Sequence, residues 1–301
     1  MRNNLWVGYV CLFTATVLWG GMYVVSKYVL AQVPVFTVLW LRYLIAFLCL
    51  FFICFRQQKL AILRQDFPII IWLSFLGYFL ANTTGFYGTH FTTSYLAALL
   101  LSLSPVFTII FASVLLKEKI SFNKVLAIGI CMVGAMIVLG FEENKGDNHL
   151  LGIMILLVSA LSWGGFSVYV KKAALKYSTI AITTYSTLLA LLMTTPFMLG
   201  EVDEQVLLTI LKPDIWLSIL YLAIFATAVA FYLWNKGLEL MEASIGSLFY
   251  FFTPVASGVL GWAMLGEHLN WNFFLGGLLI VFGASYIAIP RRKYKEAVKH
   301  L

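Results

Sequence analysis

The sequence has few charged residues and contains long runs without any. Of its 301 residues, 11% are Asp, Glu, Lys or Arg, whereas 62% are hydrophobic, and the mean hydropathy is +0.94. An average soluble domain carries about 25% charged residues. A soluble chain of this composition would lack the polar surface that water requires. The sequence therefore predicts an all-α integral membrane protein.

Patterns that would indicate other classes of protein are also missing. The sequence contains no HExxH, no GxSxG and no paired carboxylates within an apolar run, so we expect no enzymatic activity. The four cysteines lie inside apolar runs without zinc-ligand spacing, so neither a metal site nor a cofactor is expected. The net charge of +7 is divided among short clusters between apolar runs, which argues against nucleic acid as a partner.

Ten apolar runs are long enough to cross a membrane as helices, which takes about 20 residues each. They lie near residues 6–30, 34–55, 68–89, 93–116, 122–140, 150–173, 179–200, 214–236, 243–265 and 271–289. The connections between them are too short to form a soluble domain. Any function is therefore expected inside the helix bundle.

Basic residues gather at one set of ends of these runs. If the N-terminus is cytoplasmic, sixteen basic residues lie at inner ends, and only Lys145 and Lys212 lie at outer ends. Cytoplasmic segments of membrane proteins carry such an excess of Lys and Arg. We therefore expect both termini in the cytoplasm, and an even number of spans agrees with this.

Two blocks of sequence recur at fixed offsets, which indicates an internal repeat. Trp19-Gly20-Gly21 is followed by Lys27, and 144 residues later Trp163-Gly164-Gly165 is followed by Lys171 in the same way. At an offset of 149, Pro105 pairs with Pro254, Glu118 with Glu267, Asn123 with Asn272 and Gly134 with Gly283. The predicted repeats are residues 1–148 and 149–301.

Each predicted repeat holds five helices, and this odd number has a consequence. The two repeats must cross the membrane in opposite senses, which makes them inverted copies. Inverted repeats are typical of secondary transporters, whose substrate site lies near the membrane midplane between the repeats. Two near-equivalent halves allow one state open to each side, so the pattern predicts alternating access.

The motifs resemble those of a known family. Ser102-Leu103-Ser104-Pro105-Val106-Phe107 through Leu116-Lys117-Glu118-Lys119, and Thr253-Pro254-Val255 through Leu265-Gly266-Glu267, look like the signature of EamA-type members of the drug/metabolite transporter superfamily. The resemblance covers essentially the whole chain. It implies ten helices, a central cavity and export of metabolites or amphipathic compounds across a bacterial inner membrane. The first repeat has Leu-Lys-Glu where the family usually has Leu-Gly-Glu. We expect this difference to affect only the local packing at that helix end.

Polar and aromatic residues inside the runs are candidates for a substrate cavity. Trp19 and Trp163 lie at mid-helix beside glycine pairs and would offer a stacking or cation–π surface, with core packing as the alternative. Arg42 is expected about 12 Å deep, which is too deep for snorkelling and favours a partner, a wet cavity or a gate. The other cavity candidates are Tyr23, Asn82, Tyr87, Tyr95, Ser102, Tyr232, Asn235 and Tyr250.

Four residues are candidates for a hinge or a gate. Pro105 and Pro254 interrupt the fourth and ninth runs, which favours a hinge or cavity-lining role, with an inert kink as the alternative. Lys27 and Lys171 lie near the outer and inner ends of their helices, respectively. Their matched placement suits gating at opposite faces, although snorkelling would also explain each of them.

The thirteen acidic residues all lie in loops or at helix ends. Their absence from mid-membrane positions weakens a carboxylate-based proton relay and favours facilitated diffusion or exchange. Glu118 and Glu267 close the fourth and ninth runs. We expect each carboxylate to cap the start of the helix that follows it, with a gating role as the alternative.

The predicted function is secondary transport of amino-acid-like, aromatic or amphipathic metabolites across the bacterial inner membrane, with export as the favoured direction. Uptake or exchange of a nutrient or sugar derivative remains an alternative carrier function. A lipid-carrier flippase, or a subunit of one, is the alternative from another class. The expected partners are a small-molecule substrate and membrane lipid. Whether the chain also forms a homodimer is left open by the sequence.

Overall fold

The computed structural model describes residues 2–59, 61–91, 100–139, 149–265 and 271–288, and these residues form helices without any strand. The helices of the first half are α1 (Arg2–Leu30), α2 (Val35–Arg56), η1 (Arg64–Asp66), α3 (Phe67–Leu73), η2 (Ser74–Ala81), α4 (Asn82–Phe91), α6 (Ser104–Leu115) and α7 (Phe122–Leu139). Those of the second half are α8 (His149–Ala174), α9 (Thr179–Glu201), α10 (Glu204–Ile210), α11 (Pro213–Ala223), η3 (Ile224–Val229), α12 (Ala230–Leu240), α13 (Ala243–Gly246), η4 (Ser247–Phe251), α14 (Phe252–Leu265) and α15 (Trp271–Ala288).

Seven helical stretches within the described ranges are long and apolar enough to cross a membrane. They are Leu5–Leu30, Val35–Arg56, Arg64–Gly88, Leu150–Ala174, Thr179–Glu201, Pro213–Leu240 and Ala243–Leu260. The shorter apolar helices α6, α7 and α15 fall within the other three expected spans. Because neighbouring residues 92–99, 140–148 and 266–270 lie outside the described residues, the count of ten spans stays a prediction.

Many large apolar side chains are exposed on the outside of the bundle. Phe52, Leu192 and Phe282 are 56%, 59% and 59% exposed, and many other Leu, Phe and Trp side chains share this exposure. A soluble protein rarely carries such extensive apolar surface. The exposed surface therefore fits lipid rather than water.

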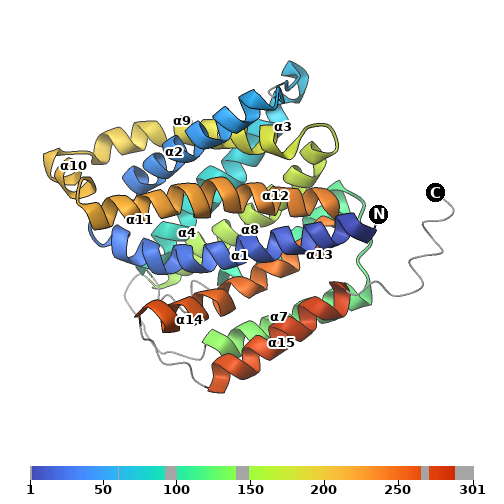
Figure 1. The fold of residues 1–301 in the computed structure, drawn as a ribbon. Coiled ribbons are helices and arrows are strands. Elements are labelled where there is room, and N and C mark those ends of the chain that lie inside the picture. The colour runs from blue at the N-terminus through green and yellow to red at the C-terminus, as the bar shows by residue number, and fades with distance from the viewer. Residues whose placement is uncertain (1, 60, 92–99, 140–148, 266–270, 289–301) are drawn as a thin grey trace.

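The helices of the two halves are interleaved. Figure 1 shows α2 beside α9 at one edge of the bundle and α7 beside α15 at the opposite edge. Between these pairs, α1 packs against α12 and α14, whereas α8 packs against α4 and α6. The first helix of each half therefore packs on helices that belong to the other half.

Two close backbone contacts hold these first helices in place. A Cβ atom added to Gly20 would lie 2.8 Å from the amide nitrogen of Ser257 on α14. A Cβ atom added to Gly164 would lie 2.9 Å from the amide nitrogen of Thr108 on α6. Ser257 follows Thr108 at the 149-residue offset, so the same contact is built twice. Small residues permit such approaches between membrane helices, where packing drives association.

Each half also contains a π-helical segment that sequence analysis did not predict. The segments η2 and η3 interrupt the stretches Arg64–Gly88 and Pro213–Leu240. Side chains bond across the wide turns: the Asn82 amide donates to Gly77 O at 2.8 Å, and the Thr227 hydroxyl donates to Leu222 O at 2.7 Å. π-Bulges occur frequently at functional sites.

The glycine contacts give a prediction about stability. Gly20→Ala and Gly164→Ala should each destabilise the fold by about 1–3 kcal/mol, because the added methyl would meet backbone atoms that cannot move aside cheaply. The measurement is the apparent melting temperature of the purified protein in detergent. Gly129→Ala is the matched control, since no atom lies within 4 Å of the added carbon. Equal melting temperatures for all three variants would contradict the argument.

Candidate functional site

Five aromatic side chains meet where helices from both halves come together. We call Trp19, Trp163, Phe231, Trp234 and Tyr250 the tryptophan cluster. The rings of Trp19 and Trp163 lie edge to face with centroids 5.1 Å apart. Trp234 lies 5.2 Å from Trp19, and Tyr250 lies 5.5 Å from Trp163. The cluster therefore joins α1 of the first half to α8, α12 and η4 of the second.

The cluster contains two residues that sequence analysis did not single out. Phe231 and Trp234 project from α12, and each contacts both Trp19 and Trp163. Asn235, which was predicted to line the cavity, lies on the same helix. A helical spacing of three and four residues places Phe231, Trp234 and Asn235 on one face. That periodicity was the signal that could have identified the two aromatic residues.

Several polar atoms of this region are buried without a partner among the described residues. The indole nitrogen of Trp19 donates to Ala226 O at 3.0 Å, but those of Trp163 and Trp234 have no acceptor there. The Asn235 amide nitrogen donates to the Thr183 hydroxyl at 3.0 Å, whereas its oxygen receives no bond in this part of the chain. The site thus offers two indole donors and one amide acceptor to a small molecule.

Arg42 is fully buried beside the cluster. Its Nε donates to the Thr227 hydroxyl at 3.1 Å, and its Nη2 lies 3.4 Å from the sulfur of Met22. The ring of Phe86 lies 5.6 Å from the guanidinium carbon, within the range of a cation–π contact. No carboxylate pairs with Arg42 in the described residues, and its Nη1 has no partner among them.

The other predicted cavity residues lie elsewhere or outside the described part. The Tyr87 hydroxyl donates to Glu201 at 3.5 Å, and the Asn82 amide donates to Gly77 O in the preceding segment η2. Tyr232 packs against residues of α2 and α9, and Ser102 is buried in the turn before α6. The candidates that the structure does not describe are Tyr95, Glu267 and the side chains of Tyr23 and Lys27.

The two prolines lie at the beginnings of helices rather than in the middle of uninterrupted ones. A turn at residues 102–103 precedes α6, and Pro105 occupies the first turn of that helix. The 3₁₀ segment η4 precedes α14, and Pro254 lies in the first turn there. Proline is accommodated in a first helical turn because the backbone N–H groups of that turn have no acceptor within the helix, so the N–H that proline lacks is not needed there. In both cases the α-helix that contains the proline therefore begins one or two residues before it.

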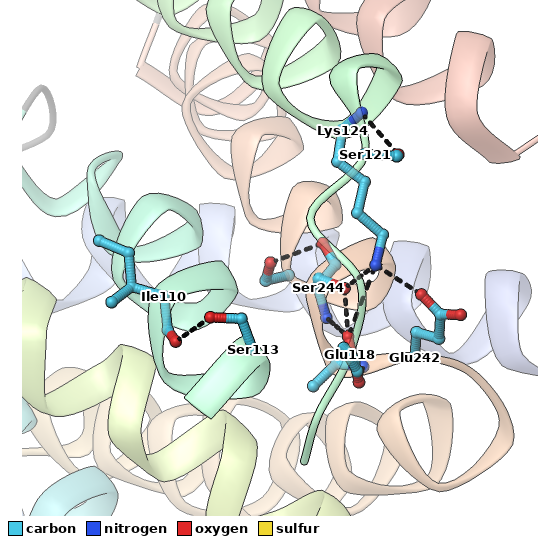
Figure 2. Close-up of polar contacts among 9 residues, drawn as sticks. Ile110, Ser113, Glu118, Ser121, Lys124, Glu242 and Ser244 are labelled. Carbon is cyan, nitrogen blue, oxygen red and sulfur yellow. Dashed lines mark hydrogen bonds and ion pairs between the residues drawn. The ribbon is translucent and has the colours of Figure 1, made fainter. Parts of the chain in front are cut away.

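At one end of the bundle, a network of charged residues connects the two halves (Figure 2). We call Glu118, Lys124, Glu242 and Ser244 the inner-end network, after the end of the bundle that the distribution of basic residues predicts to face the cytoplasm. The ammonium group of Lys124 lies 2.6 Å from Glu242 Oε2, 2.7 Å from the Ser244 hydroxyl and 3.8 Å from Glu118 Oε2. Lys124 is 5% exposed, so the surrounding water screens these contacts little.

Glu118 accepts bonds from a different helix than sequence analysis expected. Its carboxylate receives the backbone N–H of Ala243 at 2.8 Å and that of Ser244 at 3.2 Å, together with the Ser244 hydroxyl. These donors begin α13, whereas the prediction assigned Glu118 to the start of the following helix, α7. The carboxylate thus links the end of α6 to the second half of the chain.

Other lysines at this end bond to backbone or carboxylate groups. The ammonium group of Lys171 donates to Glu239 O on α12 at 2.9 Å. Lys176 lies 2.9 Å from Asp66, and this hydrogen bond raises the pKa of Lys176 above its ordinary value. The pair therefore stays ionised throughout the physiological range.

A helical bundle with lipid-facing apolar surfaces and a buried polar and aromatic centre defines a multi-pass membrane protein of the transporter class. Comparison with known proteins identifies the particular family. The EamA-like transporter family matches residues 6–140 and again residues 150–289. The chain belongs to this family, whose model matches it twice, once in each half.

Relatives of the chain carry transporter names. The protein named "Uncharacterized transporter YetK" of Bacillus subtilis (strain 168) is 30% identical over 296 residues, which cover 96% of this chain and 88% of the relative. The protein named "Probable amino-acid metabolite efflux pump" of Escherichia coli (strain K12) is 26% identical, covering 94% and 95% of the two chains. A solved crystal structure with 20% identity superimposes with a TM-score of 0.80 over 95% of this chain and 96% of the other, which shows the shared fold.

The inner-end network gives a second prediction. Glu118→Ala should separate the start of α13 from the end of α6, because the donors of Ala243 and Ser244 lose their acceptor. The measurement uses Ser247→Cys, a buried position of η4, in a background with the native cysteines replaced by alanine. A membrane-impermeant thiol reagent added to inside-out vesicles should label this cysteine severalfold faster once Glu118 is removed.

The control for this experiment is Lys236→Ala. It removes an ion pair with Glu239 that lies within one helix and connects no segments of different halves. Labelling of Ser247→Cys should stay unchanged in that variant. Equal labelling rates in the presence and absence of the Glu118 side chain would show that the network does not hold the end of the bundle together.

Proposed function

We propose that this protein is a secondary carrier that exports small metabolites of amino-acid-like, aromatic or amphipathic character across the bacterial cytoplasmic membrane by alternating access. In this proposal the chain crosses the membrane ten times as two inverted five-helix repeats, residues 1–148 and 149–301, with both termini in the cytoplasm. The substrate passes unchanged, without a catalytic step.

The observation that carries the proposal is the tryptophan cluster. Trp19 and Trp163 occupy matched positions of the two halves and meet at the centre of the bundle. The binding site of a carrier built from repeats lies between them near the membrane midplane. Aromatic faces with a few unpartnered polar atoms suit ligands that combine a flat apolar part with polar groups.

Alternating access is supported by features that occur in both halves. The glycine contacts of α1 and α8 recur at matched positions, as do the π segments η2 and η3. Matched scaffolds permit two arrangements of similar free energy, one open on each side. The inner-end network lies at the end that carries most of the basic residues, so it is suited to close the cytoplasmic side.

The direction of transport is supported by one relative. The Escherichia coli protein aligned over 94% of this chain is named "Probable amino-acid metabolite efflux pump". Export of a related chemical class by this chain is consistent with its aromatic and polar centre. An identity of 26% supports the same chemical class of substrate but does not specify the same compound, and the experiment below identifies it.

The test is an untargeted comparison of metabolites outside cells that express the wild-type protein, an empty vector or the Trp19→Ala variant. The wild-type protein should enrich one or more compounds outside the cell. Trp19→Ala should lower this enrichment about fivefold to tenfold, since an aromatic contact contributes roughly 1 kcal/mol beyond its buried area. The abundance of each variant in the membrane is measured in parallel.

Trp72→Ala is the matched control, because Trp72 is 54% exposed on the outside of the bundle. This variant should export as well as the wild-type protein. Selective depletion of a compound from the medium would contradict export and indicate uptake. A change confined to lipid-linked precursors would favour the flippase function. Normal export by the Trp19→Ala variant would show that Trp19 does not contribute to the transport path.

A further inference from the structure

The buried guanidinium of Arg42 is the feature that the proposed function leaves unexplained. The side chain is 0% exposed in the interior of the bundle, yet the described residues supply it with one hydroxyl, one thioether sulfur and one aromatic ring. A charge in such a position is costly unless it is paired, and such charges usually mark substrate or ion pathways. The interaction that compensates the charge must come from outside these residues.

The position of the guanidinium relative to the tryptophan cluster is fixed by two neighbouring residues of η3. Trp19 donates to Ala226 O, and Arg42 donates to the hydroxyl of the next residue, Thr227. The sulfur of Met22, a residue about one helical turn after Trp19 on α1, lies 3.4 Å from Arg42 Nη2. A ligand in contact with Arg42 would therefore have the indole of Trp19 beside it.

The unpartnered polar atoms of this region describe a ligand. Arg42 Nη1 and the indole nitrogens of Trp163 and Trp234 are donors, whereas Asn235 Oδ1 is an acceptor. A carboxylate satisfies guanidinium and indole donors, and its bond to arginine is charge-assisted. An ammonium or amide N–H would satisfy the acceptor. Aromatic rings between these groups favour a flat apolar part.

The two halves differ at this position, which argues against a purely architectural role. At the 144-residue offset Arg42 corresponds to Ser186, which is equally buried on α9. A structural requirement of the duplicated fold would apply to both positions. The guanidinium is present in one half alone, so it serves something that the fold itself does not require.

From these observations we infer that Arg42 binds the carboxylate of the transported molecule, while the tryptophan cluster receives its aromatic or other flat apolar part. The inference rests on the proposed function and names its substrate class: small carboxylic acids with an aromatic group, including those that also carry an amino group. Arg42 is then the residue that sets the charge preference of the carrier.

The test measures binding with four matched probes. These are 3-phenylpropionate with a carboxylate, phenethylamine with an ammonium group, phenylalanine with both, and 3-phenylpropanol with neither. The full chain is placed in phosphatidylcholine nanodiscs, and the intrinsic tryptophan fluorescence is titrated with each probe. Wild-type protein should bind the two carboxylates more tightly than phenethylamine or 3-phenylpropanol.

Arg42→Gln should weaken binding of the two carboxylates by about tenfold to a hundredfold, the effect of losing one charge-assisted bond. Binding of 3-phenylpropanol should stay unchanged. Arg42→Lys should retain part of the carboxylate affinity, because it keeps the charge without the two-pronged geometry. Ser186→Ala, at the matched position of the other half, should bind all four probes as the wild-type protein does.

Three results of the binding measurement would overturn the inference. Equal weakening of all four probes in Arg42→Gln would assign Arg42 to the structure of the bundle. Failure of the wild-type protein to bind either carboxylate at millimolar concentration would show that Arg42 forms no carboxylate-binding site. A fluorescence change with chloride alone that is as large as that with 3-phenylpropionate, and that Arg42→Gln abolishes, would assign the guanidinium to an inorganic anion.

The outcome for transport is separate from the outcome for binding. Counterflow of labelled phenylalanine is measured in proteoliposomes that contain the same variants. Carboxylate binding that depends on Arg42, without any counterflow, would support the inference and contradict the proposed carrier function. Counterflow that is unaffected by Arg42→Gln would support the carrier and overturn the role of Arg42.

Discussion

The close approach of α1 and α8 to helices of the opposite half is the contact on which the rest of the structure depends. Gly20 and Gly164 let the two helices approach the backbones of α14 and α6. In a lipid surrounding apolar burial gives little driving force between helices, so such packing contacts determine which helices associate. Trp19 and Trp163 directly precede these glycines, and the centroids of their rings lie 5.1 Å apart in the interior of the bundle.

The scaffold is duplicated, but the side chains that it carries are not. Lys124, which connects Glu118 to Glu242, corresponds to Phe273 at the 149-residue offset, and Arg42 corresponds to Ser186 at the other offset. A symmetric protein would give its two access states equal free energies. Under the proposed alternating access, charged contacts that only one half makes would shift the equilibrium between the two states, and a substrate would change that equilibrium by binding one state more tightly.

The sequence was sufficient to predict the helical membrane fold and the family, because apolar runs and repeated motifs are local signals. It assigned Glu118 to the wrong helix, since the choice between α7 and α13 depends on how distant segments pack. It also missed η2 and η3, because a π turn arises from a single extra residue per turn that hydropathy does not register. Trp234 was missed because its one signal, the helical spacing that it shares with Phe231 and the polar Asn235, is also common among apolar residues that only pack in a core.

The tryptophan cluster and Arg42 illustrate how a membrane carrier differs from a well-packed core. Each buried polar atom without a partner costs about 1–3 kcal/mol, and four such atoms are found around one group of rings. A fold selected for stability alone would replace them with apolar side chains of similar size, as the neighbouring Leu12, Val38 and Leu39 show. In the proposed function, these atoms would gain their bonds from the substrate. The free energy of those bonds would then favour substrates whose donors and acceptors complement those of the site.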